Sequence, residues 1–220
     1  MIKTVGLLQR REGLDATGFR EHYEQNHAPM ATKLLEFSGY QRNYPESDRA
    51  RDELGLDGFS EFWFQDAAEI SRIGELMQGD IGALFVEDEL RFMNRPANQS
   101  YEVTERLYGA RPAPGKVLRA IAISRLPVGA KPGTRERALD SHDTRVRERA
   151  ISGVIAALHS VPDRLVSPLP AGAAGVGCIE SLWLENRDTL AECNRWRARE
   201  GAPPLWVVEE SGTPILAWPD

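Results

Sequence analysis

The sequence contains few cysteines and few histidines for a chain of 220 residues. Its 2 cysteines, Cys178 and Cys193, do not make a disulfide framework and indicate a reduced intracellular protein. They do not have the spacing of metal ligands. His22 and His27 are 5 residues apart, which places them on different faces of a regular helix. The sequence therefore predicts no metal site.

The chain also lacks an excess of basic residues and long apolar runs. Its net charge is -6, which argues against nucleic acid and anionic membranes as partners. No apolar run approaches the roughly 20 residues that span a bilayer. A strand-like pattern begins at Ile2 with no signal peptide before it. We therefore expect a soluble cytoplasmic protein without a nucleic-acid or membrane partner.

Two common signals of cofactor or nucleophile chemistry are absent. The glycine-rich run at residues 172–177 precedes a strand pattern and does not join a strand to a helix, so it offers no helix N-terminus to a phosphate. No Gly-x-Ser-x-Gly motif occurs. The sequence therefore indicates a protein that works without a nucleotide.

One pattern occurs twice in the chain. The segment Val5-Gly-Leu-Leu-Gln-Arg10 and the later His27 correspond, at a shift of 115 residues, to a segment ending at Arg125 and to His142. Trp63 corresponds to Trp183 at a slightly larger shift. A fixed internal period indicates two copies of one structural unit.

Hydrophobic periodicity predicts the same order of elements in each half: strand, helix, strand, strand, helix, strand. The first half shows strands at residues 2–9, 39–44, 59–64 and 100–107, helices after Asp15 and Asp66, and a loop at 45–56; the second shows strands at 117–124, 153–158, 178–184 and from 205, with helices around 138–146 and 190–196. This order is the ferredoxin-like βαββαβ arrangement of an α+β protein. The proline-rich residues 111–115 separate two predicted domains, 1–110 and 117–220.

Each half is predicted to form an antiparallel sheet with its helices on one face. The other face needs a cover, and Phe62, Phe64, Leu182 and Leu184 are candidates for apolar residues on it. We therefore expect the halves to pack sheet to sheet as a pseudo-dimer. The pocket is expected between the sheet and the helices of each half.

The first half resembles a known family. The segment Phe19-Arg-Glu-His-Tyr-Glu-Gln-Asn-His-Ala-Pro29, the strand at 57–64 and the acidic run at 87–92 are similar to the EthD family of dimeric α/β-barrel proteins. The resemblance covers roughly residues 1 to 105. It implies two ferredoxin-like units forming a barrel within one chain, and a small pocket for an aromatic or cyclic compound, usually without a metal or nucleotide cofactor.

His27 is the leading catalytic candidate because it lies on the apolar face of its predicted helix and titrates near neutral pH. Pro29 is expected to kink that helix and to bias Ala28 away from helical angles. The resemblance implies an acid/base role for His27, assisted by Tyr40 at the start of the next strand. His142 is the counterpart in the second copy, but no proline follows it and Val154 stands opposite Tyr40.

Four further residues are candidates for substrate binding. Asn26 and Arg10 have groups that orient a substrate oxygen, although surface or capping roles are equally compatible with their positions. Tyr44 and Trp63 are aromatic candidates whose alternative role is packing on the sheet.

The resemblance and the histidine together favour a cofactor-independent lyase or isomerase of the dehydratase, decarboxylase or lactone-isomerase type. His27 would move a proton on a small aromatic or cyclic metabolite, and Tyr40 would donate to the developing oxyanion. Three alternatives stay open: a cofactor-free oxygenase of phenols, a haem-binding barrel, and a non-catalytic binder of hydrophobic metabolites. A homodimer of the two-domain chain also stays open.

Overall fold

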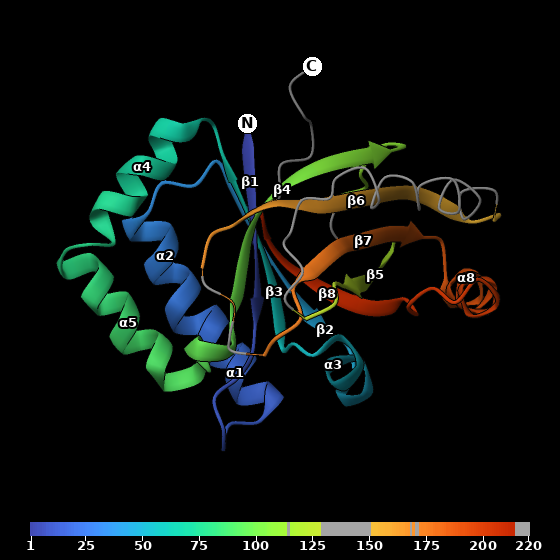
Figure 1. The fold of residues 1–220 in the computed structure, drawn as a ribbon, viewed down its shortest axis with the longest axis horizontal. Helices are drawn as coiled ribbons and strands as arrows, with labels where there is room; N and C mark the ends of the chain where they lie inside the picture. Colours follow the sequence, from blue (N-terminus) through green and yellow to red (C-terminus); the bar gives the residue numbers. More distant parts are fainter. Residues whose placement is uncertain (114, 129–150, 168, 170–171, 214–220) are drawn as a thin grey trace.

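The computed structural model describes residues 1–113, 115–128, 151–167, 169 and 172–213. Its centre is a closed barrel of antiparallel strands in the order β1-β3-β2-β8-β5-β7-β6-β4 (Figure 1). This confirms a mixed α+β fold. The strands are β1 (Ile2–Leu8), β2 (Gly39–Pro45), β3 (Gly58–Phe64), β4 (Gln99–Tyr108), β5 (Leu118–Arg125), β6 (Val154–Leu165), β7 (Val176–Leu184) and β8 (Trp206–Thr213).

Helices cover the outside of the barrel. In Figure 1, α1, α2, α4 and α5 lie on one side of the strands and α8 lies on the other. Their bounds are α1 (Ala16–His22), α2 (Ala28–Leu34), α3 (Asp48–Leu54), α4 (Ala67–Leu76), α5 (Asp80–Phe92) and α8 (Arg187–Arg199). Within the described ranges, no helix is long and apolar enough to cross a membrane. The helix predicted around residues 138–146, with His142, lies outside the described residues.

The two halves of the chain contribute strands in the same spatial order. The first half supplies β4-β1-β3-β2 and the second supplies β8-β5-β7-β6. They join through their edges, because β2 pairs with β8 and β4 pairs with β6. The two halves therefore form the expected antiparallel barrel, but their sheets join edge to edge instead of packing face to face. Edge pairing satisfies the backbone groups that two open sheets would leave exposed.

The apolar faces also point the opposite way from the expectation. Phe62 packs with the helical cluster around Tyr40, and Leu182 and Leu184 pack with Cys193 of α8. Because successive strand residues face opposite sides, the neighbours Glu61, Trp63, Ser181 and Trp183 point into the lumen. The apolar face of each half is covered by its own helices.

The lumen has an apolar end and a charged end. The apolar end holds side chains from both halves, such as Val5, Phe59 and Ile179. At the charged end, Glu61 accepts from Lys3 Nζ at 2.6 Å and from Arg119 Nη1 at 2.7 Å. Burial alone would raise the pKa of Glu61, but Arg119 and Lys3 outweigh it and hold the pKa well below its usual range. Glu61 therefore stays ionised inside the barrel.

Arg111, from the segment between the two halves, enters this charged end. Its guanidinium lies 5.2 Å from the ring of Trp63 and 5.3 Å from the ring of Trp183. It donates to Gln41 Oε1 at 2.6 Å. The two tryptophans, one from each half, therefore hold a cation between them.

Some local predictions were wrong for identifiable reasons. Residues predicted as a loop contain α3, which Ser47 caps by accepting from the Ala50 N–H and which Gly55 ends at a φ of 67°. The pattern after Asp66 predicts one helix that reaches Ile81, but α4 ends at Leu76 and Ile81 lies in the next helix, α5. Ala28 is helical, with φ -66° and ψ -41°. The chain reaches Pro29 through a π-helical turn, Tyr23–His27, and the helix continues into α2.

Candidate active site

A cavity of about 700 Å³ lies between the outer face of the first-half strands and α5. Its volume is in the range of small-molecule sites. Strands β1, β3 and β4, the π-helical turn and α5 all contribute to its wall. The lining residues are Gly6, Leu8, Tyr23, His27, Ser60, Phe62, Glu89, Leu90, Met93, Arg95, Pro96, Asn98, Ser100, Ser167 and Leu169.

His27 is the histidine on the wall of this cavity. Its side chain is buried, and its Nδ1 lies 2.8 Å from Oδ2 of Asp88 on α5. Its ring makes edge contacts with Tyr23 at 5.1 Å and with Phe85 at 5.5 Å. A carboxylate on Nδ1 and aromatic rings around the imidazole hold the ring in one orientation.

The π-helical turn brings a second histidine to the same carboxylate. His22 Nε2 lies 2.8 Å from Oδ1 of Asp88, and its ring stacks on Phe92 at 4.6 Å. The prediction that His22 and His27 diverge assumed 3.6 residues per turn throughout. The Ala28 N–H instead bonds the carbonyl of Tyr23, which adds a residue to the turn. In the part of the chain that the structure describes, no cluster of His, Cys, Asp and Glu fits a metal ion.

The surroundings favour neutral His27. Burial lowers its pKa, and the opposing effect of Asp88 does not fully compensate. When Asp88 accepts the Nδ1 proton, Nε2 of the neutral ring carries a lone pair. Among the described residues, Nε2 has no hydrogen-bond partner. The arrangement is that of a general base held by a carboxylate.

A row of three hydroxyl groups crosses the wall of the cavity. Tyr40 donates to the Tyr23 hydroxyl at 2.8 Å, and the Tyr23 hydroxyl lies 2.7 Å from Ser60 Oγ. Tyr23 and Ser60 line the cavity with His27, whereas Tyr40 lines a separate cavity of about 570 Å³. Burial raises the pKa of Tyr23 to about 12. Tyr40, predicted as the partner of His27, therefore lies one hydrogen bond behind the residue that touches His27.

The outer wall of the cavity carries an ion pair. Glu89 Oε2 lies 2.6 Å from Arg95 Nε, and both residues line the cavity. Burial raises the pKa of Glu89 despite the opposing effect of Arg95. This pair supplies a polar edge to a cavity whose inner wall is mostly apolar.

The other predicted binding residues do not line this cavity. Arg10 pairs with Asp57, and Asn26 is exposed. Tyr44 donates to Glu24 Oε1 at 2.6 Å, beside Arg42. Trp63 is fully buried in the lumen. Arg10, Tyr44 and Trp63 thus make contacts within the fold and Asn26 faces solvent, while His142 lies outside the described residues.

Sequence reasoning missed three residues of the site: Asp88, Tyr23 and Ser60. Tyr23 lies on the same helix face as His27, four positions earlier, which was a usable signal. Asp88 lies in the acidic run that supported the family resemblance, but its proximity to His27 depends on how α5 packs. Ser60 had no signal, because a serine in a strand has no chemical role until its neighbours are known.

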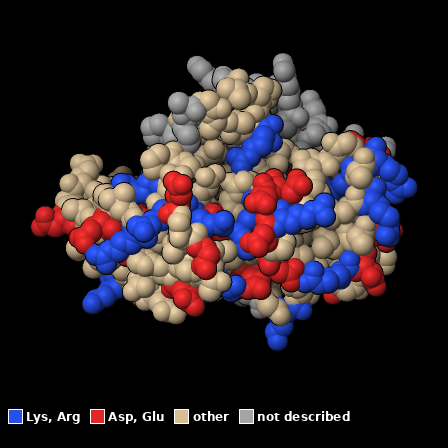
Figure 2. Space-filling model, turned by 90° about the horizontal axis from the view of Figure 1, so that it is seen from below, with Lys and Arg blue, Asp and Glu red and all other residues tan. Residues whose placement is uncertain are grey.

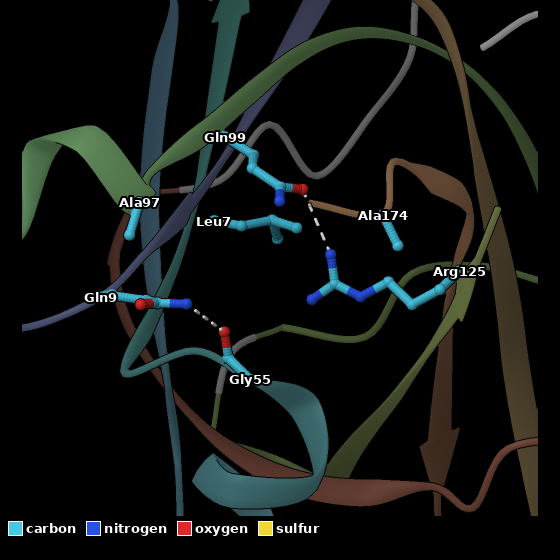
Figure 3. Close-up of a pocket in the computed structure, with 7 residues that line it drawn as sticks. All are labelled: Leu7, Gln9, Gly55, Ala97, Gln99, Arg125 and Ala174. Atoms are coloured by element: carbon cyan, nitrogen blue, oxygen red, sulfur yellow. Dashed lines mark hydrogen bonds between the residues drawn. The ribbon is translucent and has the colours of Figure 1, made fainter. Parts of the chain in front are cut away.

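A smaller cavity of about 230 Å³ lies at one end of the lumen (Figure 3). Arg125, the repeat counterpart of Arg10, points toward Gln99 there, with Nη1 3.2 Å from Oε1. Its Nη2 donates to the Leu54 carbonyl at 3.0 Å. These bonds hold Arg125 in a role that joins β5 to α3 and β4.

The surface seen in Figure 2 carries charges of both signs. Lys and Arg side chains lie among Asp and Glu side chains across this face. On the face shown there, neither sign forms a broad patch.

The comparisons with known proteins bear on both the segment and the fold. A protein-family model, described as EthD domain, matches residues 11–96. The matched segment includes His22, His27 and Asp88, so it contains the paired histidines and their carboxylate. The match agrees with the resemblance of the first half, and no curated protein matches the chain significantly.

One solved structure shares the barrel fold over nearly the whole chain. An anthrone oxidase-like protein has a TM-score of 0.59 at 12% identity, covering 98% of this chain and 94% of its own. A candidate monooxygenase from Lactobacillus acidophilus NCFM has a TM-score of 0.49 at 10% identity, covering 96% and 95%. Another from Fusobacterium nucleatum has a TM-score of 0.48 at 8% identity, covering 97% and 95%. Only the first of these likenesses supports the barrel fold.

Proposed function

We propose that the protein is a cofactor-free oxygenase of electron-rich aromatic compounds. The observation that carries the proposal is the His27–Asp88 pair, at 2.8 Å, on the wall of a cavity of about 700 Å³. The proposed substrates are phenols and carbon acids. In the carbon acids, the acidic C–H lies between an aromatic ring and a ring that bears a carbonyl group. The name of the anthrone oxidase-like protein supports this choice over the lyase or isomerase that the sequence ranked first.

The proposed reaction begins with proton transfer to Nε2 of His27. The resulting carbanion passes one electron to O₂, and the two radicals recombine to a peroxide anion. The His27 imidazolium protonates this anion to a hydroperoxide. Removal of the remaining C–H proton, with cleavage of the O–O bond, then releases water and a carbonyl. One CH₂ group and one O₂ thus yield one C=O and one H₂O, with His27 returned to its neutral form.

The lining of the cavity suits such a substrate. Leu8, Phe62 and Met93 offer apolar contact to a flat ring, and Gly6 leaves room above the strand. A base in an apolar cavity acts on a weak acid more effectively than in water, because little solvent competes for the lone pair. Asp88 stabilises the imidazolium that forms.

An oxygen electrode tests the proposal. Wild-type protein with anthrone or a dihydroxynaphthalene should consume one O₂ per product formed, and His27→Ala should lose at least ~10²-fold in rate while its thermal unfolding stays two-state. Product formation under argon would instead favour a lyase or isomerase. Saturable binding without product would favour a binding protein, and a Soret band after haem incubation would favour a haem protein.

We also propose that the chain is a tandem duplication of ferredoxin-like units, residues 1–110 and 117–220. The shift of 115 residues and the shared strand order support it. The register supports it at a shift of 116 in the first strand, because Lys3 pairs with Trp63 on β3, and Arg119, 116 residues later, pairs with Trp183 on β7. Separately expressed halves should reassemble into one barrel on mixing, which size-exclusion chromatography checks.

A further inference from the structure

We infer that Ser60 binds the oxyanion that forms when the substrate loses its proton, and that Tyr23 and Tyr40 are positioning residues that orient its hydroxyl. The inference rests on the proposed function and adds a substrate requirement to it. The substrate must gather negative charge on an oxygen atom, as a phenolate or an enolate does. A carbon acid without such an oxygen would not use this group.

The number of hydroxyl protons sets the direction of the hydrogen bonds in the row of Tyr40, Tyr23 and Ser60. Each hydroxyl has one proton to donate. Tyr40 donates its proton to Tyr23 at 2.8 Å, so the Tyr23 proton goes to its other partner, Ser60 Oγ, at 2.7 Å. Ser60 thus accepts from Tyr23 and keeps its own proton. Within the described residues, Ser60 Oγ has no further partner, and Ser60 lines the cavity.

Tyr40, at the end of this row of hydroxyl groups, is held rigidly. Tyr40 is buried, and its ring stacks on Phe62 with the ring centres 4.7 Å apart and an interplanar angle of 12°. The Arg42 guanidinium lies over the Tyr40 ring, 4.7 Å from its centre. Burial also raises the pKa of Tyr40 well above its ordinary value, so it remains a neutral donor. A donor fixed before the substrate arrives needs no reorganisation during the reaction.

The base, His27, and the donor, Ser60, both contact Tyr23. Tyr23 contacts the imidazole of His27 at 5.1 Å between ring centres and bonds Ser60 through its hydroxyl at 2.7 Å. Gly6 pairs with Ser60 across β1 and β3, and its missing side chain leaves the serine accessible. A substrate lying over Gly6 therefore meets a proton acceptor on one side and a hydrogen-bond donor on the other.

The test uses 4-nitrophenol, whose ionisation is read directly from its absorbance. Bound to wild-type protein, it should titrate below its pKa in free solution, because Ser60 stabilises the phenolate. Ser60→Ala should raise the pKa of the bound phenol by ~1 unit, and Ser60→Thr, which restores a hydroxyl, should reverse most of this. Tyr40→Phe should shift it in the same direction by a smaller amount.

Tyr101→Phe is the matched control. Tyr101 is also a buried strand tyrosine, but its hydroxyl donates to Gln99 Oε1 at 2.9 Å and does not belong to the row of Tyr40, Tyr23 and Ser60. Equal titrations of wild type and Ser60→Ala, or an unshifted pKa with wild type, would overturn the inference. So would a shift as large in Tyr101→Phe as in Tyr40→Phe. This readout needs no turnover, so it separates failure of the oxyanion role from failure of the oxygenase activity.

Discussion

His22 and His27 bind the two oxygens of one carboxylate, that of Asp88, at 2.8 Å each. The π-helical turn between them makes this possible, and it ends where α2 begins at Ala28. A turn of this kind is costly in isolation and recurs at functional sites. Here the turn carries His27 and connects α1 to α2, so that both histidines reach the carboxylate on α5.

Replacing Asp88 with Asn should lower the rate of oxygen uptake by ~10²-fold or more. The amide can offer its NH₂ to Nδ1 and so favour the wrong tautomer of His27. It also removes a negative charge that raises the pKa of His27. The base works in its neutral form, so the acid limb of the kcat/KM profile should move to lower pH. A pH series of initial rates measures both effects.

The control for this experiment is Glu87→Gln. Glu87 is the neighbouring acidic residue of α5, but it is exposed and pairs with Arg91. It should leave both the rate and the pH limb unchanged. An Asp88→Asn protein with wild-type rate and limb would show that the carboxylate does not hold the base.

Replacing His22 with Ala should shift the same limb in the opposite direction. His22 lowers the pKa of His27, so its removal should raise that pKa and move the acid limb to higher pH. The rate at high pH should fall less than in His27→Ala, because Asp88 still holds Nδ1. A shift to lower pH would mean that His22 acts on His27 in another way than through charge.

Gly6→Val should reduce binding of large substrates while leaving the barrel folded. A Cβ at Gly6 would meet Leu8 at 3.6 Å and Ser100 Oγ at 3.9 Å, which are ordinary contacts. The added methyl groups would project into the cavity. We expect Gly6→Val to raise KM more for a three-ring substrate than for a one-ring phenol. Gly6→Ala, the smaller substitution, is the control and should raise KM less. An equal change in KM for both substrates would show that the substrate rings do not lie over Gly6.

Arg111→Ala should destabilise the barrel by about 3 kcal/mol, because Glu61 loses one of its cations and the two tryptophan rings lose the group between them. Urea unfolding followed by tryptophan fluorescence measures this free energy. Lys116→Ala, an exposed residue of the same connecting segment, should cost less than ~0.5 kcal/mol. Equal stability of Arg111→Ala and wild type would show that the charged end of the lumen does not depend on this residue.

Much of the strand pattern was predictable, because buried strands are short apolar runs bounded by turn residues. The starts of α1 and α4 were also predictable, since Asp15 and Asp66 cap them as their positions suggest. The short helix α3 was missed because only Ala50 and Leu54 are buried on it, too few for a periodic signal. The turn before Pro29 was missed because a proline predicts a break in a regular helix and says nothing of a π-helical alternative.

The amino-acid pattern alone predicted an α+β fold built from two similar halves, and it placed His27, the proposed base, on an apolar helix face. Both are local properties, read from spacing along the chain. Only the tertiary structure decided that the halves join by their edges, that each apolar face turns to its own helices, and that Asp88, Tyr23 and Ser60 complete the site. Those relations join residues far apart in the chain: His27 and Asp88 are 61 positions apart, and Gln41 of β2 and Glu210 of β8 are 169 apart. They depend on packing between elements, which no local spacing encodes.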